Sequence, residues 1–344
     1  MSTNHPSIRV IAQLAGVSIA TVSRVINNNG RFSEATRERV LRVIDEQGYV
    51  ANMAAKSLRS AKSRNVGMIV PDISNDFFSA IALHVERHLA ARGYSAFVCN
   101  SGNDPQRELD YFRTLTSKLV DGVLCISGLN TLSDEALPDG IPVVCIDRYP
   151  ENERSIPRVS SEDIAASNMA TEHLIAQGCQ RILFISSYTA RHSRRDRFEG
   201  YRQALEAHGM PILADNLAYV TGERPSMEEA DNLVHAHLHA HGLDFDGVFA
   251  SSDHAAVGAL RALTRSGVAV PEQVKIAGFD NSVYAQLTSP AITSVERHPD
   301  ELARQGCNVL LQLIDGGQVP ATTLVSTELI VRASSRRVEE PPSR

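Results

Sequence analysis

Residues 16–37 read GVSIATVSRVINNNGRFSEATR, and their apolar spacing predicts a helix that starts close to Ser18. Val22, Val25 and Ile26 recur at i, i+3 and i+4, so they share one face that can be buried. A serine is a favourable N-cap, because its side chain can accept a hydrogen bond from a free backbone N–H. The opposite face of this helix is left for solvent or for a partner molecule.

Further helices are expected on both sides of this stretch. The preceding one has apolar residues at helical spacing, namely Ile8, Ile11, Ala12 and Ala15, and Gly16 allows a tight turn after it. A third helix is expected from Ser33 to Gly48, with a buried stripe of Val40, Val43 and Ile44. Three short helices with a tight turn between the first two are typical of a helix-turn-helix DNA-binding domain, which we place at residues 1–50.

A recognition helix presents its first residues to base edges in the major groove. The base-reading candidates are Ile19, Ala20, Thr21, Ser23, Arg24 and Asn27. Ile19 and Ala20 suit the thymine methyl group, and Arg24 can donate two hydrogen bonds to guanine. The candidates for contact with the DNA backbone are Ser18, Arg9, Arg31 and Arg37. The alternative is a small helical bundle that only docks on the rest of the chain.

Charge separates this head from the remaining chain. The whole chain has a net charge of −6. Residues 1–65 hold ten Lys/Arg and four Asp/Glu, a net of +6, so the remainder carries −12. A basic head on an acidic body indicates that the head alone meets a polyanion.

The head also resembles a known family. GVSIATVSRVIN, FSEATRERVL and GYVAN look like the corresponding segments of the LacI/GalR bacterial transcription repressors. The resemblance covers nearly the whole chain and implies a homodimer that binds a pseudopalindromic double-stranded operator, with a CG step at its centre. One departure is Val10, where the family commonly has an aspartate three residues after the cap of the first helix.

Residues 51–64, ANMAAKSLRSAKSR, are alanine-rich and basic, and they fit either a marginal helix or a plain linker. The resemblance implies a hinge helix that folds on DNA and enters the minor groove. Leu58 would then be wedged between base pairs and kink the duplex. Ala55, Lys56 and Arg59 would lie beside it.

From residue 65 onward, apolar strands alternate with amphipathic helices. This pattern predicts parallel sheets covered by helices on both faces, here two doubly wound α/β subdomains in residues 65–337. DGVLCIS (121–127) resembles DGVFASS (246–252), and VVCID (143–147) resembles KIAGFD (275–280), so the body looks duplicated. Asp147 and Asp280 each end a strand, and ligands bind at that edge of open α/β sheets.

The body resembles the periplasmic sugar receptors, and the resemblance implies a site for a small effector, a sugar or sugar derivative. Position by position it assigns to this site Asn75, Phe77, Phe78, Asp147, Arg148, Arg191, Arg197, Ser252, Asp280 and Arg297. Ser252 replaces a common asparagine and Arg297 a common glutamine, so a more anionic ligand is an alternative to a neutral sugar. The expected first subdomain is 65–161 with 293–322, and the second is 162–290 with 323–337. Residues 338–344 are expected to form a disordered tail.

Other signals are weak. The five cysteines are scattered and are interpreted as reduced core residues. VHAHLHAHG (234–242) offers two i, i+4 histidine pairs, as His84 and His88 do, but solvated helix faces explain them more simply than a metal site. No nucleophile–base pair or phosphate loop is found, so neither an enzyme nor a cofactor is expected. No secretory signal or membrane-spanning run is seen, which places the protein in the cytoplasm, associated with the nucleoid through DNA binding.

We therefore expect a sequence-specific DNA-binding transcriptional regulator, a repressor of sugar utilisation genes that a small effector releases from, or recruits to, its operator. Two alternatives remain: a sugar-binding or sugar-processing protein whose head only docks it, and a regulator controlled by a partner protein instead of a sugar. Steep salt dependence of DNA binding would favour the regulator over the first alternative. DNA binding without any ligand response would favour the second.

Overall fold

The computed structural model describes residues 6–26, 29–49, 62–151, 156–187, 192–212, 217–220 and 226–336. It divides into a head that ends at Ser63 and a body that begins at Arg64. The predicted base-reading Asn27, the hinge residues Ala55, Lys56, Leu58 and Arg59, the effector candidate Arg191 and the tail 338–344 lie outside the described residues.

The head is the predicted three-helix unit. Its helices are α1 (Ile8–Ala15), α2 (Ile19–Ile26) and α3 (Glu34–Glu46), and α1 and α2 meet at 101°. Gly16 ends α1 in the left-handed region with φ of 62°, which makes the tight turn possible. The core of the head consists of Ile11, Ala12, Ala15, Val22, Val25 and Val40. Of the expected α3 stripe, Val43 and Ile44 are only partly buried and pack at the edge of this core.

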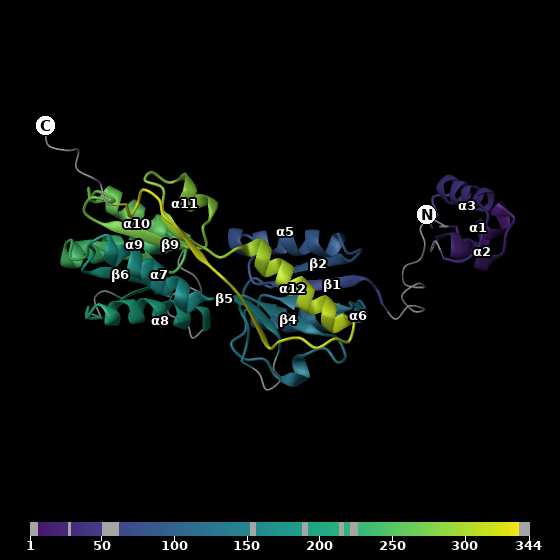
Figure 1. The fold of residues 1–344 in the computed structure, drawn as a ribbon, viewed down its shortest axis with the longest axis horizontal. Coiled ribbons are helices and arrows are strands. Elements are labelled where there is room, and N and C mark those ends of the chain that lie inside the picture. Colours follow the sequence, from purple (N-terminus) through teal and green to yellow (C-terminus); the bar gives the residue numbers. More distant parts are fainter. Residues whose placement is uncertain are drawn as a thin grey trace. The chain divides into compact units, whose positions relative to one another are not determined.

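The body contains two sheets with equivalent strand orders, shown side by side with their helices in Figure 1. The first sheet has the order β11-β5-β4-β3-β1-β2. Its strands are β1 (Asn65–Val70), β2 (Ser95–Asn100), β3 (Gly122–Cys125), β4 (Val143–Ile146), β5 (Arg158–Ser161) and β11 (Thr322–Val325). Helices α5 (Asp76–Ala90) and α12 (Pro299–Ile314) share one hydrophobic core with this sheet, and α6 (Pro105–Ser117) contributes to another. We call this unit the first lobe.

The second sheet has the order β12-β10-β9-β8-β6-β7. Its strands are β6 (Ile182–Ser187), β7 (Leu217–Val220), β8 (Gly247–Ala250), β9 (Lys275–Phe279), β10 (Thr293–Glu296) and β12 (Glu328–Ile330). Helices α7 (Asp163–Ala176) and α8 (His192–Ala207) pack together, and α9 (Met227–His241) and α10 (Asp253–Arg265) form another core with the sheet. With these helices and the short α11 (Val283–Leu287), the sheet forms the second lobe.

The repeated motifs of the sequence occupy equivalent positions, since β3 and β4 correspond to β8 and β9 in the two strand orders. The predicted doubly wound α/β body is thus confirmed. One detail of the all-parallel expectation is wrong: β12 pairs with β10 in antiparallel fashion. The sequence pattern also did not predict strands β5, β10, β11 and β12.

The expected subdomain borders shift, because the chain crosses between lobes later than predicted. β10 (Thr293–Glu296) belongs to the second sheet, so the crossing follows it, at Arg297 and His298. β11 (Thr322–Val325) belongs wholly to the first sheet, so the return lies after Val325 instead of at residue 323. Among the described residues, no single helix is long and apolar enough to cross a bilayer; only α1 and α2 taken together across their bend reach that length.

Candidate functional site

The head exposes the beginning of α2, where the base-reading candidates were expected. Ser18 accepts a hydrogen bond from the backbone N–H of Thr21 at 3.1 Å, so the predicted N-cap is present. Val22 and Val25 are buried, whereas Ile19 and Ala20 are exposed. Arg24 is also exposed, and its aliphatic stem passes close to Gly30, where a Cβ would lie 3.3 Å from the arginine Cδ.

The residues predicted to contact the DNA backbone differ in exposure and in the interactions that they make within the protein. Arg9 and Arg31 are exposed. Arg37 forms an i, i+3 ion pair with Glu34 at 3.1 Å on α3. The side chain of Ser18 is already engaged in capping α2, which leaves its hydroxyl lone pairs only partly available. At the departure noted in α1, the cap residue Ser7 makes no side-chain capping bond.

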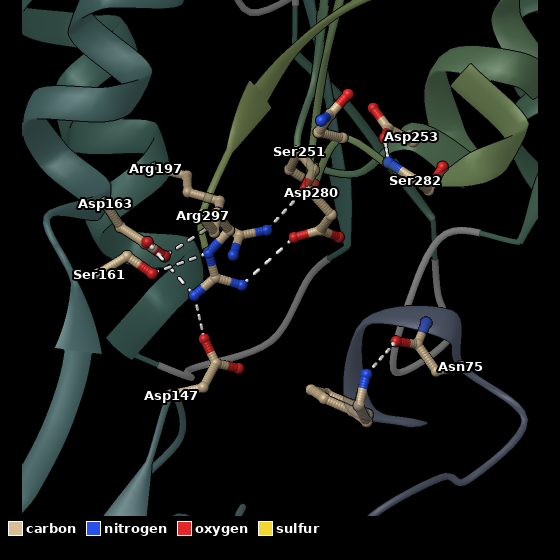
Figure 2. A network of polar contacts seen from close by, with 12 residues as sticks. Asn75, Asp147, Ser161, Asp163, Arg197, Ser251, Asp253, Asp280, Ser282 and Arg297 are labelled. Carbon is tan, nitrogen blue, oxygen red and sulfur yellow. Dashed lines mark hydrogen bonds and ion pairs between the residues drawn. The ribbon is translucent and has the colours of Figure 1, made fainter. Parts of the chain in front are cut away.

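In the body, the two strand-end aspartates meet around one buried arginine, as Figure 2 shows. Arg297 is only 1% exposed. Its guanidinium pairs with Asp147 at the end of β4 and with Asp280 at the end of β9, the latter at 3.2 Å. It also donates to Ser161 Oγ at 2.9 Å and lies 3.5 Å from Asp163.

Two further arginines complete this inter-lobe cluster, which we define as Asp147, Arg148, Ser161, Asp163, Arg197, Asp280 and Arg297. Arg197 donates to Asp163 at 3.0 Å and to the carbonyl of Ser251 at 2.5 Å. Arg148 lies 4.0 Å from Asp147. The cluster therefore holds three guanidinium groups and three carboxylates, and its formal charge is balanced.

Aromatic rings cover the cationic side of the cluster. The guanidinium carbon of Arg297 lies 4.2 Å from the ring centre of Phe77, and that of Arg148 lies 4.9 Å from Phe78. Arg197 lies 3.9 Å from Phe279. These distances are in the range of favourable cation–π contacts, which strengthen when water is excluded.

The charges determine the protonation of the cluster. Burial alone would raise the pKa of Asp147, but the guanidinium groups of Arg297, Arg148 and Arg197 outweigh burial and hold this pKa below its ordinary value. Burial would lower the pKa of Arg297, and Asp147, Asp163 and Asp280 instead raise it. The pair of Asp147 and Arg297 is therefore ionised at neutral pH.

Neighbouring residues from the predicted set have structural tasks as well. Asn75 caps α5 by accepting from the N–H of Phe78 at 3.2 Å. Ser252 caps α10 by accepting from the N–H of Ala255 at 3.3 Å. Arg197 donates to the carbonyl of the preceding residue, Ser251, instead of to Ser252. Asp253 lies just behind, where burial and the Asp280 carboxylate raise its pKa to about 7.

A cavity of 590 Å³ adjoins the cluster at Ser161 and Asp163. Both lobes line it, with Tyr149 and Arg158 from the first and Asn168 and Gln203 from the second. This volume suits a small molecule.

The structure brings together four of the predicted effector residues, Asp147, Arg197, Asp280 and Arg297. Ser161 and Asp163, which the sequence reasoning did not name, lie among them. These two lie at the crossing from β5 to α7, and the strand of four residues, RVSS, has no apolar run to mark it. The repeat gave no signal either, because β10, which corresponds to β5 in the second sheet, was not predicted from the sequence. Among the described residues no group of three or more His, Cys, Asp and Glu could hold a metal ion.

A helix-turn-helix head joined to a two-lobed body of this kind defines a DNA-binding regulator with a periplasmic-receptor-like second domain. Residues 7–52 match the model of the bacterial regulatory proteins, lacI family, and residues 171–335 match the periplasmic binding protein-like domain. The chain is 34% identical over 334 residues to the ribose operon repressor of Halalkalibacterium halodurans, covering 96% of this chain and 97% of that one. The chain therefore belongs to the lacI family and is a transcriptional regulator.

Solved structures show the same architecture. The transcriptional regulator CelR in complex with cellobiose is 31% identical, with a TM-score of 0.71, over 96% of this chain and 99% of that one. The lac repressor dimer bound to operator and the anti-inducer ONPF has a TM-score of 0.83 over 96% of this chain and 99% of that one. At 22% identity, this second likeness concerns the fold alone.

Proposed function

We propose that this regulator represses genes of sugar utilisation and that a neutral, polyhydroxylated small molecule binds between its lobes and changes its affinity for the operator. The supporting observation is the balanced inter-lobe cluster, in which Asp147 and Asp280 come from equivalent strand ends of the two lobes. Carboxylates and guanidinium groups together can accept from and donate to sugar hydroxyls. The relatives named for the ribose operon and in complex with cellobiose support the same ligand class.

The charge of the cluster argues for a neutral ligand over an anionic one. The extra arginine at position 297 was a reason to expect a sugar acid or a sugar phosphate. In the structure three carboxylates already surround it, so it offers no uncompensated positive charge. An anionic ligand would add a net charge to a buried and balanced group, which costs free energy.

We propose the exposed residues of α2 as the DNA-reading surface, with Ile19 and Ala20 against thymine methyl groups and Arg24 against guanine. The other predicted base-reading residues are Thr21, Ser23 and Asn27. The DNA phosphates are held by Arg9 and Arg31. The segment with Leu58 enters the minor groove. A dimer of this chain fits an operator with two half-sites. Exposed apolar side chains suited to such a dimer lie on both lobes: Leu83, Phe97 and Val98 on the first, and Val283, Tyr284 and Leu287 on the second. A regulator that binds the bacterial chromosome acts in the cytoplasm.

The deciding experiment is a thermal-shift screen of the full chain against neutral pentoses and hexoses, sugar acids and sugar phosphates. A ligand that binds the folded state raises the melting temperature by mass action. We expect a dose-dependent rise with a neutral sugar. A rise with acids or phosphates alone would contradict the charge argument, and a hit must also shift operator affinity to count as the effector.

A further inference from the structure

The side chain of Arg297 lies where the chain crosses between the lobes. β10 ends at Glu296 in the second sheet, and α12 begins at Pro299 against the first. Another crossing runs from Ser161, at the end of β5 in the first sheet, to Asp163, at the start of α7 in the second lobe. Arg297 donates to Ser161 Oγ at 2.9 Å and lies 3.5 Å from Asp163, so one guanidinium group ties two crossings together.

The same group also bridges the strand-end loops of the two lobes. Asp147 belongs to the first lobe and Asp280 to the second, and Figure 2 shows the guanidinium between them. The ring of Phe77 on α5, also in the first lobe, packs against it at 4.2 Å. Separation of the lobes would therefore remove Asp147 and Phe77 from a cation that is 1% exposed.

The free energy of the body without ligand favours the contacts of Arg297 with Asp147 and Phe77. A buried charge that loses its partners is costly, whereas a pair at the surface contributes little. Among the described residues, two other ion pairs span the lobes, His254–Asp76 at 3.9 Å and Arg195–Glu151 at 4.0 Å, but both are long and partly or largely exposed. Arg297 is thus the main polar bridge among the described contacts between the lobes. A neutral glutamine in its place would supply no charge to the three carboxylates.

We propose that Arg297 is an internal latch, which holds the two lobes together in the absence of any ligand by occupying the carboxylates Asp147 and Asp280. A ligand that uses these carboxylates has to compete with the guanidinium group for them. The latch sets the population of closed body before the effector arrives, and a ligand can shift that population only by its differential affinity for the two states. The inference goes beyond the proposed function, because it concerns the protein without effector.

The test measures lobe closure in the full chain without ligand. Asp76→Cys and His254→Cys place one thiol on each lobe, at side chains whose polar atoms lie 3.9 Å apart. A short bifunctional methanethiosulfonate reagent then reports how often the two thiols are close. Each single-cysteine variant measures background labelling, since Cys99 is half-buried and the four other cysteines are buried.

In this reporter, Arg297→Gln should slow the inter-lobe cross-link about tenfold, the change expected if the closed population falls by an order of magnitude. Arg332→Gln is the matched control, because it removes a partly buried arginine that lies outside the inter-lobe cluster and whose hydrogen bonds to the carbonyl of Ile292 at 2.8 Å and to Asn281 lie within the second lobe. It should leave the cross-linking rate unchanged.

The double variant Arg297→Gln/Asp147→Asn is the control for misfolding. It removes the bridge between the lobes and keeps equal numbers of positive and negative charges in the cluster. It should show the same slow cross-linking. An unchanged rate in both Arg297 variants would overturn the latch, as would an equal slowing in Arg332→Gln. Because no effector is used, none of these outcomes depends on the identity of the ligand.

Discussion

At the scale of single residues, Asp147 and Asp280 occupy backbone conformations that aspartate rarely adopts, at positions where their carboxylates are needed. Asp147 has φ of 64° and Asp280 has φ of 103°, a region that residues other than glycine rarely adopt. Such strain persists only where the surroundings hold it, and it concentrates at functional sites. Glycine would relax both turns but would remove the carboxylates that hold Arg297. The duplicated strain therefore supports a binding role for both positions.

Asp253 should make the stability of the body depend on pH. Its pKa is raised from 3.8 to about 7 by burial and by Asp280, so the folded state keeps a proton that the unfolded chain has lost. The free energy of unfolding therefore falls as pH rises toward 7, by about 1.4 kcal/mol between pH 6 and pH 8. Asp253→Asn cannot ionise and should lack this loss.

The measurement is the melting temperature of both proteins at pH 6, 7 and 8. The difference between them isolates Asp253, because the histidines titrate in both. The two curves should be separated most at pH 8, with the variant more stable relative to the wild type than at pH 6. A separation that does not change with pH would show that Asp253 is ionised throughout this range.

Arg24 should contribute base specificity. Arg24→Ala is expected to cost about 1–3 kcal/mol on the cognate operator and to relax selection at one base pair. Arg31→Ala is the comparison, because a phosphate contact should weaken binding to all sequences alike and reduce the salt slope by about one. Competition binding against operators with single substitutions measures both. Equal loss on operator and on random DNA in Arg24→Ala would assign that arginine to the DNA backbone.

At the scale of elements, predictability followed how each element is buried. The three helices of the head were predicted because they bury apolar residues at regular spacing, as Val22 and Val25 do on α2. The central strands of each sheet were predicted because every residue of β3 and β8 is buried and apolar or glycine. Helices α7 and α12 were not predicted. The buried face of α7 is made largely of alanine, serine and threonine, which shows no clear amphipathic pattern. Helix α12 buries Leu302, Val309 and Leu310 on one face, so its pattern was present in the sequence and was overlooked.

The pairing of α7 and α8 depends on Gly200. A Cβ at this position would lie 2.8 Å from both the backbone nitrogen of Asn168 and the Cβ of Ser167, and would also contact the carbonyl of Ile164. Gly200→Ala should therefore force the two helices apart and destabilise the body by about 1–3 kcal/mol. The same shift would separate Asp163 on α7 from Arg197 on α8, which are 3.0 Å apart.

Urea unfolding of the body measures this cost. Gln203→Ala, one turn further along α8, is the control, because it removes an exposed side chain whose hydrogen bond, to Glu199 at 2.7 Å, stays within the same helix. A Gly200→Ala protein as stable as the control would mean that the helices can separate at no cost.

At the scale of the whole molecule, duplication explains which part of the site the sequence could reveal. Residues at equivalent strand ends, Asp147 and Asp280, could be recognised from the repeat alone. The crossing residues could not, because only the pairing of β5 with β4 and of β10 with β9 brings Ser161 and Arg297 together. Sequence pattern predicts elements and edges, while the contacts between chain crossings depend on the final arrangement of two sheets.

Coupling between the head and the body should obey thermodynamic reciprocity. If the effector changes operator affinity by some factor, the operator changes effector affinity by the same factor. Asp280→Asn should weaken the effector by at least about tenfold, since hydrogen bonds to a charged group contribute about 1.5–3 kcal/mol. Asparagine is chosen over alanine because it tolerates the positive φ at this position.

Operator affinity without effector should also change in this variant, because Asp280 holds one end of the Arg297 latch and a neutral amide holds the guanidinium group less strongly. Fluorescence anisotropy of a labelled operator, titrated with and without effector, measures both quantities. A variant that keeps the full effector response would move the ligand away from the inter-lobe cluster. An operator affinity without effector equal to that of the wild type would show that the ion pair of Asp280 with Arg297, at 3.2 Å, does not set the conformation that the head depends on.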